Sequence, residues 1–147
     1  MRLFSEKSQI TNRQTDLVIA HQLPCDKGSY DYLSKIQQAG IPILYILGSK
    51  TDYALFNKLN TGLIVNLYNN KTKTDAQASF NSAFALFSLN EQSSEMIKDF
   101  PPLNAPLARF IVAAGTQTLA YQYIAGAKSE YPLLCFTNNP QQKNGIV

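Results

Sequence analysis

The sequence predicts a single α/β domain over residues 1–147, doubly wound, with a mostly parallel sheet in its N-terminal half. Two continuous apolar runs, residues 16–23 and 41–47, are rich in β-branched residues and indicate strands that are buried on both faces. A segment with helical spacing separates them, which is the crossover that parallel strands require. In the C-terminal half we expect antiparallel strands or hairpins.

Breaking residues mark the first strand, the first helix and the second strand. Pro24 ends the first apolar run. Residues 29–39 place apolar side chains at helical spacing, and Gly40 follows as the residue that ends the helix in a left-handed conformation. Pro42 is tolerated because it stands at the start of the second strand.

A tight turn leads from the second strand into a second helix. Its sequence is Gly48-Ser49-Lys50-Thr51-Asp52, in which Ser49, Thr51 or Asp52 can cap the helix that follows. That helix ends near residue 60, and residues 63–67 form a third strand. Because strands and helices alternate, we expect the third strand to lie parallel to the other two, with right-handed crossovers.

The second half of the chain has shorter apolar stretches separated by turn residues. Residues 69–79 are polar and predict a loop, whereas Asn90 is placed to cap a short helix over residues 91–98. Beyond an extended, proline-rich connection, the predicted strands are a hairpin of residues 109–114 and 117–124, followed by residues 131–136 and 144–147 with Asn138-Asn139-Pro140 between them.

Composition excludes several classes of function. Hydrophobic residues make up 45% of the chain, which supports a core and argues against disorder. The net charge is +3, but the basic residues are scattered, so we expect no nucleic-acid partner. No apolar run approaches the roughly 20 residues that span a bilayer, and the residues after Met1 do not read as a signal peptide. We therefore expect no direct membrane insertion by this segment.

The residues that follow the first strand are one candidate site, because α/β sheets bind ligands beyond the carboxyl ends of their strands. His21 is the single histidine of the chain, and Cys25 and Asp26 follow it closely. A Cys25–His21 pair is conceivable, since a nucleophile needs a base. However, Pro24-Cys25-Asp26 lacks the glycine-rich elbow that exposes a nucleophile. Ordinary packing or hydrogen bonding of His21 is the alternative.

The turn after the second strand is the other candidate. It stands where phosphate-binding loops stand, but its single glycine does not match their spacing, and a capped turn explains it. One histidine, dispersed acids and two distant cysteines, Cys25 and Cys135, provide no set of metal ligands, so we expect no metal and no cofactor. Free thiols are expected rather than a disulfide. The candidate ligand-binding residues are His21, Cys25, Ser49, Thr51 and Asp52.

Residues 16–24 and 39–48 resemble class I glutamine amidotransferase-like domains. The particular likeness is to the version found in large bacterial membrane proteins of the aerotolerance/von Willebrand factor A type. Phe100-Pro101-Pro102-Leu103 and Tyr131-Pro132-Leu133-Leu134 also resemble that group. The resemblance implies a flavodoxin/amidotransferase-like fold and a position outside the cytoplasmic membrane.

The same resemblance implies that the chain has lost the family's catalytic site. Active amidotransferases carry a nucleophilic cysteine in a Gly-x-Cys-x-Gly elbow and a later His-x-Glu. Here Gly48-Ser49-Lys50 follows the second strand, and no histidine follows His21. No catalytic residue can be carried over.

We therefore expect a non-catalytic, amidotransferase-like module of a larger membrane-anchored envelope protein, serving assembly or partner binding. Its partners would be other domains of that protein or other envelope proteins, and its location periplasmic. The final residues, Gly145-Ile146-Val147, read as the start of a strand, which suggests an excised part. The alternative function is a small hydrolase or ligand-binding enzyme that uses His21, Cys25 and the turn at residues 48–52. The alternative location is cytoplasmic.

Overall fold

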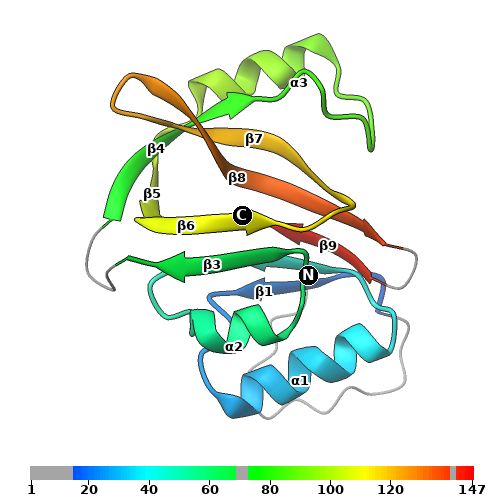
Figure 1. The fold of residues 1–147 in the computed structure, drawn as a ribbon. Coiled ribbons are helices and arrows are strands. Elements are labelled where there is room, and N and C mark those ends of the chain that lie inside the picture. Colours follow the sequence, from blue (N-terminus) through cyan, green and yellow to red (C-terminus); the bar gives the residue numbers. More distant parts are fainter. Residues whose placement is uncertain (1–14, 69–72, 140–141) are drawn as a thin grey trace.

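The described residues form two β-sheets and three short α-helices (Figure 1). The computed structural model describes residues 15–68, 73–139 and 142–147. A seven-stranded sheet has the order β1-β2-β9-β8-β7-β4-β5, and a two-stranded sheet pairs β3 with β6. The strands are β1 (Val18–His21), β2 (Ile43–Ile46), β3 (Leu63–Leu67), β4 (Lys73–Phe80), β5 (Leu103–Pro106), β6 (Ala108–Val112), β7 (Thr116–Ile124), β8 (Ala127–Asn139) and β9 (Gln142–Ile146).

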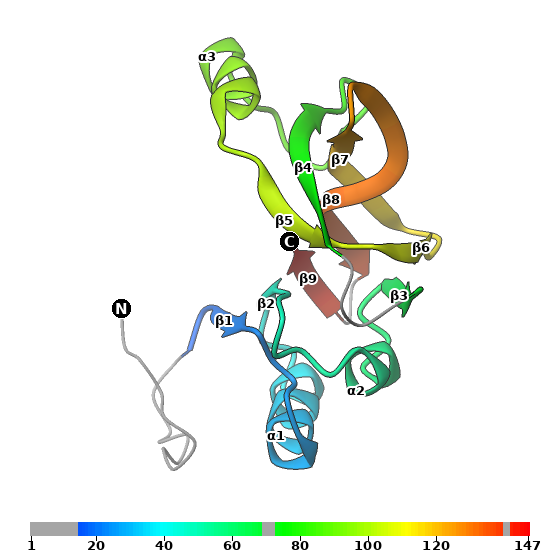
Figure 2. The same cartoon turned by 90° about the vertical axis from the view of Figure 1, so that its left-hand side faces the viewer.

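The parallel part of the large sheet consists of β1, β2 and β9. Ala20 lies beside Tyr45 across the first pair, and Tyr45 beside Ile146 across the second. Helices α1 (Lys27–Gln38) and α2 (Tyr53–Lys58) lie on one side of these strands, whereas α3 (Glu91–Met96) lies at the other end of the molecule (Figure 2). The main core forms between the strands and α1 and α2, where Leu33, Ile36 and Phe56 are fully buried.

The ends of the helices follow the local sequence. Asp26 caps α1 through a capping box with Ser29, and Gly40 follows the helix with φ +70°, as predicted. Asp52 is the residue of the turn that caps α2, and Asn90 caps α3 as predicted. These caps satisfy backbone N–H groups that the first turn of a helix leaves without a partner.

The predicted doubly wound α/β fold is wrong. The structure is mostly β, and the seven-stranded sheet is mixed. Strand β3 does not join the parallel strands: it runs antiparallel to β6 in the small sheet, while the last strand, β9, occupies the position beside β2. The pattern of β3 fits this position, because Leu63 and Val65 are buried and Ile64 is exposed, as in a strand with one solvated face.

The prediction that the first strand is buried on both faces is also wrong. Strand β1 lies at the edge of the sheet, and α1 and α2 cover one face only. Ala20 on the covered face is 1% exposed, whereas Ile19 on the opposite face and Leu17 just before the strand are each 52% exposed. Apolar residues therefore occupy both faces of β1, but the described part of the chain buries only one.

Two predictions for the second half are corrected by strand pairing. Residues 73–79 of the predicted polar loop belong to β4, which pairs with β5 and β7. The predicted hairpin of residues 109–124 does not form, because β6 pairs with β3 and β7 pairs with β8. The hairpin that does form joins β7 to β8 at Ala125 and Gly126, both with positive φ. Of the predicted turn Asn138-Asn139-Pro140, the last residue lies outside the described residues.

A polar junction ties the small sheet to the large one at Thr61 and Gly62. The Thr137 hydroxyl donates to the Thr61 carbonyl at 2.7 Å, and the Thr116 hydroxyl donates to the Gly62 carbonyl at 3.2 Å. The buried side chain of Asn144 also donates to the Thr61 carbonyl, at 3.4 Å. Because these bonds come from β7, β8 and β9, the start of β3 is fixed against three strands of the large sheet.

Candidate functional site

No hydrogen bond joins the two predicted site residues His21, which ends β1, and Cys25, which follows it. His21 is exposed, and its Nε2 lies 3.4 Å from Nε2 of Gln22. Side chains alternate along a strand, so His21 lies on the opposite face to buried Ala20 and the helices. Cys25 is an exposed free thiol, and its Sγ lies 3.8 Å from both Oδ2 of Asp26 and Oγ of Ser29. Within the described residues, the hydrogen bonds of Cys25 and His21 thus go to other neighbours and not to each other.

Asp26, the acid next to Cys25, is engaged in capping α1. Its Oδ1 accepts from the backbone N–H of Ser29 at 2.7 Å and from the Ser29 hydroxyl at 2.8 Å. Ser29 lowers the pKa of the carboxyl, first through its backbone N–H and then through its hydroxyl. A carboxylate held this way serves the helix rather than a nucleophile.

The turn after β2 is held by its own predicted residues. Oγ1 of Thr51, which is buried, accepts from the backbone N–H of Gly48 at 3.0 Å. Oδ1 of Asp52 accepts from the backbone N–H of Leu55 at 3.0 Å, so this carboxylate caps α2. The two side chains are engaged in forming the turn and starting the helix.

Gln22, which sequence reasoning missed, joins the two candidate loops. Its Oε1 accepts from the backbone N–H of Lys50 at 3.1 Å and from the Ser49 hydroxyl at 3.4 Å. A Cβ on Gly48 would lie 2.7 Å from Cγ of Gln22, so only glycine permits this approach. A glutamine in a loop has no distinctive sequence signal, and the contact depends on two strands that lie side by side.

A depression of about 480 Å³ lies beside this turn. Ser49, Thr51 and Asp52 line it, together with residues of β4 and β5, but His21 and Cys25 do not. The predicted site residues therefore fall into two separate groups rather than one pocket.

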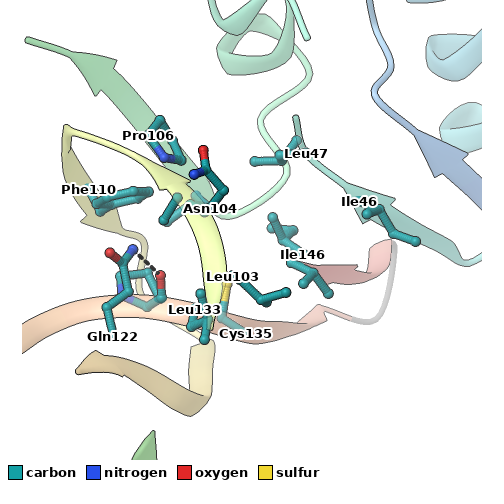
Figure 3. A pocket seen from close by; sticks show the side chains of 14 residues that line it. Ile46, Leu47, Leu103, Asn104, Pro106, Phe110, Gln122, Leu133, Cys135 and Ile146 are labelled. Atoms are coloured by element: carbon teal, nitrogen blue, oxygen red, sulfur yellow. Dashed lines mark hydrogen bonds between the residues drawn. The ribbon is translucent and has the colours of Figure 1, made fainter. Parts of the chain in front are cut away.

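A second hollow, which no sequence pattern predicts, lies where β2 and β9 end against β5, β6 and β8 (Figure 3). Its volume is about 170 Å³. The wall is mainly apolar and includes Leu103, Phe110, Leu133 and Ile146. We call it the apolar pocket. Its residues come from seven strands (β2, β3 and β5 to β9) between residues 46 and 147, and no local pattern could have grouped them.

Three polar side chains line the apolar pocket: Asn104, Gln122 and Cys135. Gln122, 2% exposed, donates from Nε2 to the carbonyl of Pro132 at 3.0 Å. Cys135 is fully buried, and burial raises the pKa of its thiol to about 12, so the thiol is neutral. No lining side chain carries a charge. The pocket therefore suits neutral groups rather than ions.

A metal-ligand cluster and a membrane-spanning helix are both absent from the described residues. Within residues 15–68, 73–139 and 142–147, no group of three His, Cys, Asp or Glu side chains is placed to hold a metal ion. In those ranges there is likewise no helix with the length and apolar character needed to cross a membrane.

Comparisons with known proteins bear on the fold alone. No protein-family model matches the sequence, and no curated protein matches it. Among solved structures, the chain is similar to part of a cold-adapted β-galactosidase from Rahnella sp. R3, with 15% identity and a TM-score of 0.51, over 90% of this chain and 20% of that one. It is also similar to the mmIFT52 N-terminal domain, with 16% identity and a TM-score of 0.45, over 90% of this chain and 64% of that one.

The chain thus spans a fifth of the β-galactosidase chain and less than two thirds of the mmIFT52 domain. At 15% identity the first likeness concerns the arrangement of strands and helices, not activity. Neither likeness tests the resemblance to amidotransferase-like domains, which stays a prediction.

Proposed function

We propose that this chain is a non-catalytic module of a larger membrane-anchored envelope protein, positioned on the periplasmic side and serving assembly or partner binding. The observation that carries the proposal is an apolar surface on the parallel strands, on the side away from α1 and α2. We call it the open face. It consists of Leu17, Ile19, Leu44, Phe84, Phe87 and Phe136.

The open face is continuous across four elements. Ile19 of β1 lies beside Leu44 of β2, which in turn lies beside Gly145 of β9. A Cβ on Gly145 would lie 2.8 Å from Cδ1 of Leu44 and 3.0 Å from Cε1 of Phe136, so these two side chains approach each other over the glycine. The surface therefore extends from the edge of the sheet to β8.

An aromatic cluster of Phe84, Phe87 and Phe136 lies at the β8 end of the open face. The ring centroids of Phe87 and Phe136 lie 5.3 Å apart in an edge-to-face arrangement, and Phe84 lies 4.8 Å from Phe87. Phe87 is still 45% exposed. Contiguous exposed apolar side chains of this kind mark interaction surfaces on soluble proteins.

The occupant that suits the open face is an amphipathic helix from another domain of the same protein or from an envelope partner. Parallel strands are normally covered by helices on both faces, and here α1 and α2 cover one. The named side chains of the open face carry no charge, so the helix would contribute an apolar stripe. Because Asp26, Thr51 and Asp52 are engaged in caps and a turn, the loops after β1 and β2 favour binding over catalysis.

The proposal is tested by hydroxyl-radical footprinting of Leu17, Ile19 and Phe87 in the isolated chain and in the full-length protein in its native membrane. We expect strong labelling in the isolated chain and protection of all three in the full-length protein. Ile64, exposed on the small sheet, is the control that should label equally in both. Equal labelling of Ile19 in the two samples would contradict the proposal, as would a gene that encodes no membrane-spanning segment beside this chain.

A further inference from the structure

We propose that two copies of this chain associate through the outer edges of their β1 strands, which pair antiparallel about a twofold axis at Ile19. The occupant of this edge is thus a second copy of the chain, and the large sheet continues from one copy into the other. The inference is independent of the proposed function. Edge pairing adds backbone hydrogen bonds in the plane of the sheet and leaves the side chains of the open face uncovered.

The backbone of β1 presents a row of hydrogen-bonding groups at its outer edge. Strand β1 is the end strand of the large sheet, with β2 on its inner side (Figure 2). The N–H groups of Val18 and Gln22 donate to carbonyls on the β2 side, at 3.0 and 2.7 Å. Along a strand these groups alternate in direction, so those of Ile19 and His21 point outward. Among the described residues, no strand pairs with β1 on that side.

The outer edge of β1 lacks the features that prevent sheets from joining. Natural edge strands carry lysine, proline, a bulge or an inward-pointing charge, and each of these opposes pairing with another chain. Residues 17–21 contain no lysine, proline or acid, and β1 pairs with β2 without a bulge. By contrast, β5 at the other end of the same sheet ends in Pro106, which has no N–H to donate. Of the two end strands, β1 is therefore the one suited to pairing.

The segment is complementary to itself, which is why a second copy is the occupant. With Ile19 opposite Ile19 of the second copy, Leu17 lies opposite His21, and opposed residues of each pair exchange backbone hydrogen bonds. The two Asp16 carboxylates then lie at opposite ends of the pairing, so they do not repel each other across it. Gln22, with φ 57°, follows the last residue of β1 and limits the pairing to residues 17–21.

The contact is short, so we expect a reversible dimer with a Kd on the order of 100 µM. Sedimentation of the whole chain of 147 residues, from about 10 µM to about 1 mM, should show monomer at the lowest concentration and mainly dimer at the highest. A chain that stays monomeric at the highest concentration would overturn the proposal.

A matched pair of charge variants locates the contact. Ile19→Lys brings two like charges together at the twofold axis and should weaken association at least about tenfold. Ile64→Lys places the same charge at an exposed position of β3 and should associate like the native chain. Circular dichroism checks that both variants are folded. A dimer that is unaffected by Ile19→Lys, or equally weakened by Ile64→Lys, would contradict the assignment to β1.

Disulfide trapping tests the register. In Cys25→Ser the remaining cysteine, Cys135, is buried. Ile19→Cys in this background should form a disulfide-linked dimer on mild oxidation, because opposed hydrogen-bonded residues have Cα atoms about 5.5 Å apart, a distance that a disulfide spans. Ile64→Cys in the same background is the control and should form much less. Equal yields from the two variants, or no linked dimer from Ile19→Cys where the native chain sediments as a dimer, would refute the register.

Discussion

The side chain of Asn57 pairs with both backbone groups of Val65. The Val65 N–H donates to Oδ1 of Asn57 at 2.9 Å, and Nδ2 of Asn57 donates to the Val65 carbonyl at 3.0 Å. Strand β3 pairs with β6 along one edge. Along its other edge, the Asn57 carboxamide makes the two hydrogen bonds that a residue of a neighbouring strand would make. Because α2 carries Asn57, the helix and the small sheet are joined by these bonds as well as by apolar packing.

We expect Asn57→Leu to destabilise the fold by roughly 2 kcal/mol or more, because it leaves the N–H and carbonyl of Val65 unpaired while Val65 is 1% exposed. Asn57→Asp keeps an acceptor for the Val65 N–H, so it should be less destabilised than Asn57→Leu. Denaturant unfolding gives the free energies. Asn66→Leu, on the exposed side of β3, is the control, and equal stability of Asn57→Leu and this control would refute the role of the pair.

A second prediction concerns the junction at Gly62. Gly62 has φ +98°, and an added Cβ would collide with the Oγ1 atoms of Thr116 and Thr137. Gly115 has φ +84° with nothing near its missing Cβ, so it shares the backbone conformation without the crowding. Gly115→Ala should lower the free energy of unfolding by about 1 kcal/mol, because alanine is strained in the left-handed conformation. Gly62→Ala should lower it clearly more, because its Cβ also meets the two threonines. Thermal or chemical unfolding measures the stability of the two variants. Equal losses of stability would contradict the prediction, because they would show that Thr116 and Thr137 move aside for the added Cβ without cost.

A third prediction concerns acid pH and the cap of α1. Because the pKa of Asp26 is lowered in the folded chain, its contribution to stability is present above its ordinary value of 3.8 and is lost as pH falls through the lowered value. The difference in unfolding free energy between the native chain and Asp26→Asn should therefore shrink on acidification from about pH 5 to about pH 2. Urea unfolding across that range measures it. Asp31→Asn, exposed on the same helix, is the control, and a difference for Asp26→Asn that stays constant with pH would contradict the cap's ionic character.

The two cysteines should differ in their reactivity toward an alkylating reagent at pH 8. Cys25 is exposed, whereas Cys135 is fully buried with a thiol pKa of about 12. Relative to an ordinary thiol of pKa 9.0, its thiolate fraction is on the order of a thousandfold smaller. Mass spectrometry should find one adduct in the folded native chain and none in Cys25→Ser, with Cys135 modified only after unfolding. Rapid labelling of Cys135 in the folded chain would show that the apolar pocket opens to solvent.

Much of the local structure could be predicted because it depends on residues close in sequence. Asn90 caps α3 and Gly40 terminates α1 through groups within a few residues of each helix end. The limits of β3, residues 63–67, were also predicted, because the turn residues Asn60 and Gly62 precede the strand. In the structure both of these residues have positive φ. The strand that pairs with β3 could not be predicted. A strand with one buried face can pair in a parallel or an antiparallel direction, and the positions of the other strands decide which pairing forms.

The candidate site was less predictable than the fold. The sequence identified the loops after β1 and β2, and these loops do lie side by side, but the side chain that joins them is Gln22 rather than His21 or Cys25. Gln122 escaped notice because its importance comes from burial beside Pro132, which requires the β7–β8 pairing. Neither Gln22 nor Gln122 is part of a sequence motif that indicates a functional site.

The sequence by itself determined the caps, the breaks and the apolar character of the strands, because these depend on short-range hydrogen bonds and on side-chain composition. Only the tertiary structure decided the direction and neighbours of the strands. Strand β9, from the end of the chain, takes the place beside β2 that the predicted topology gave to β3. Strand order is set by the burial that the whole set of strands achieves together. The open face and the apolar pocket both result from that order, so neither could be recognised before the strands were placed.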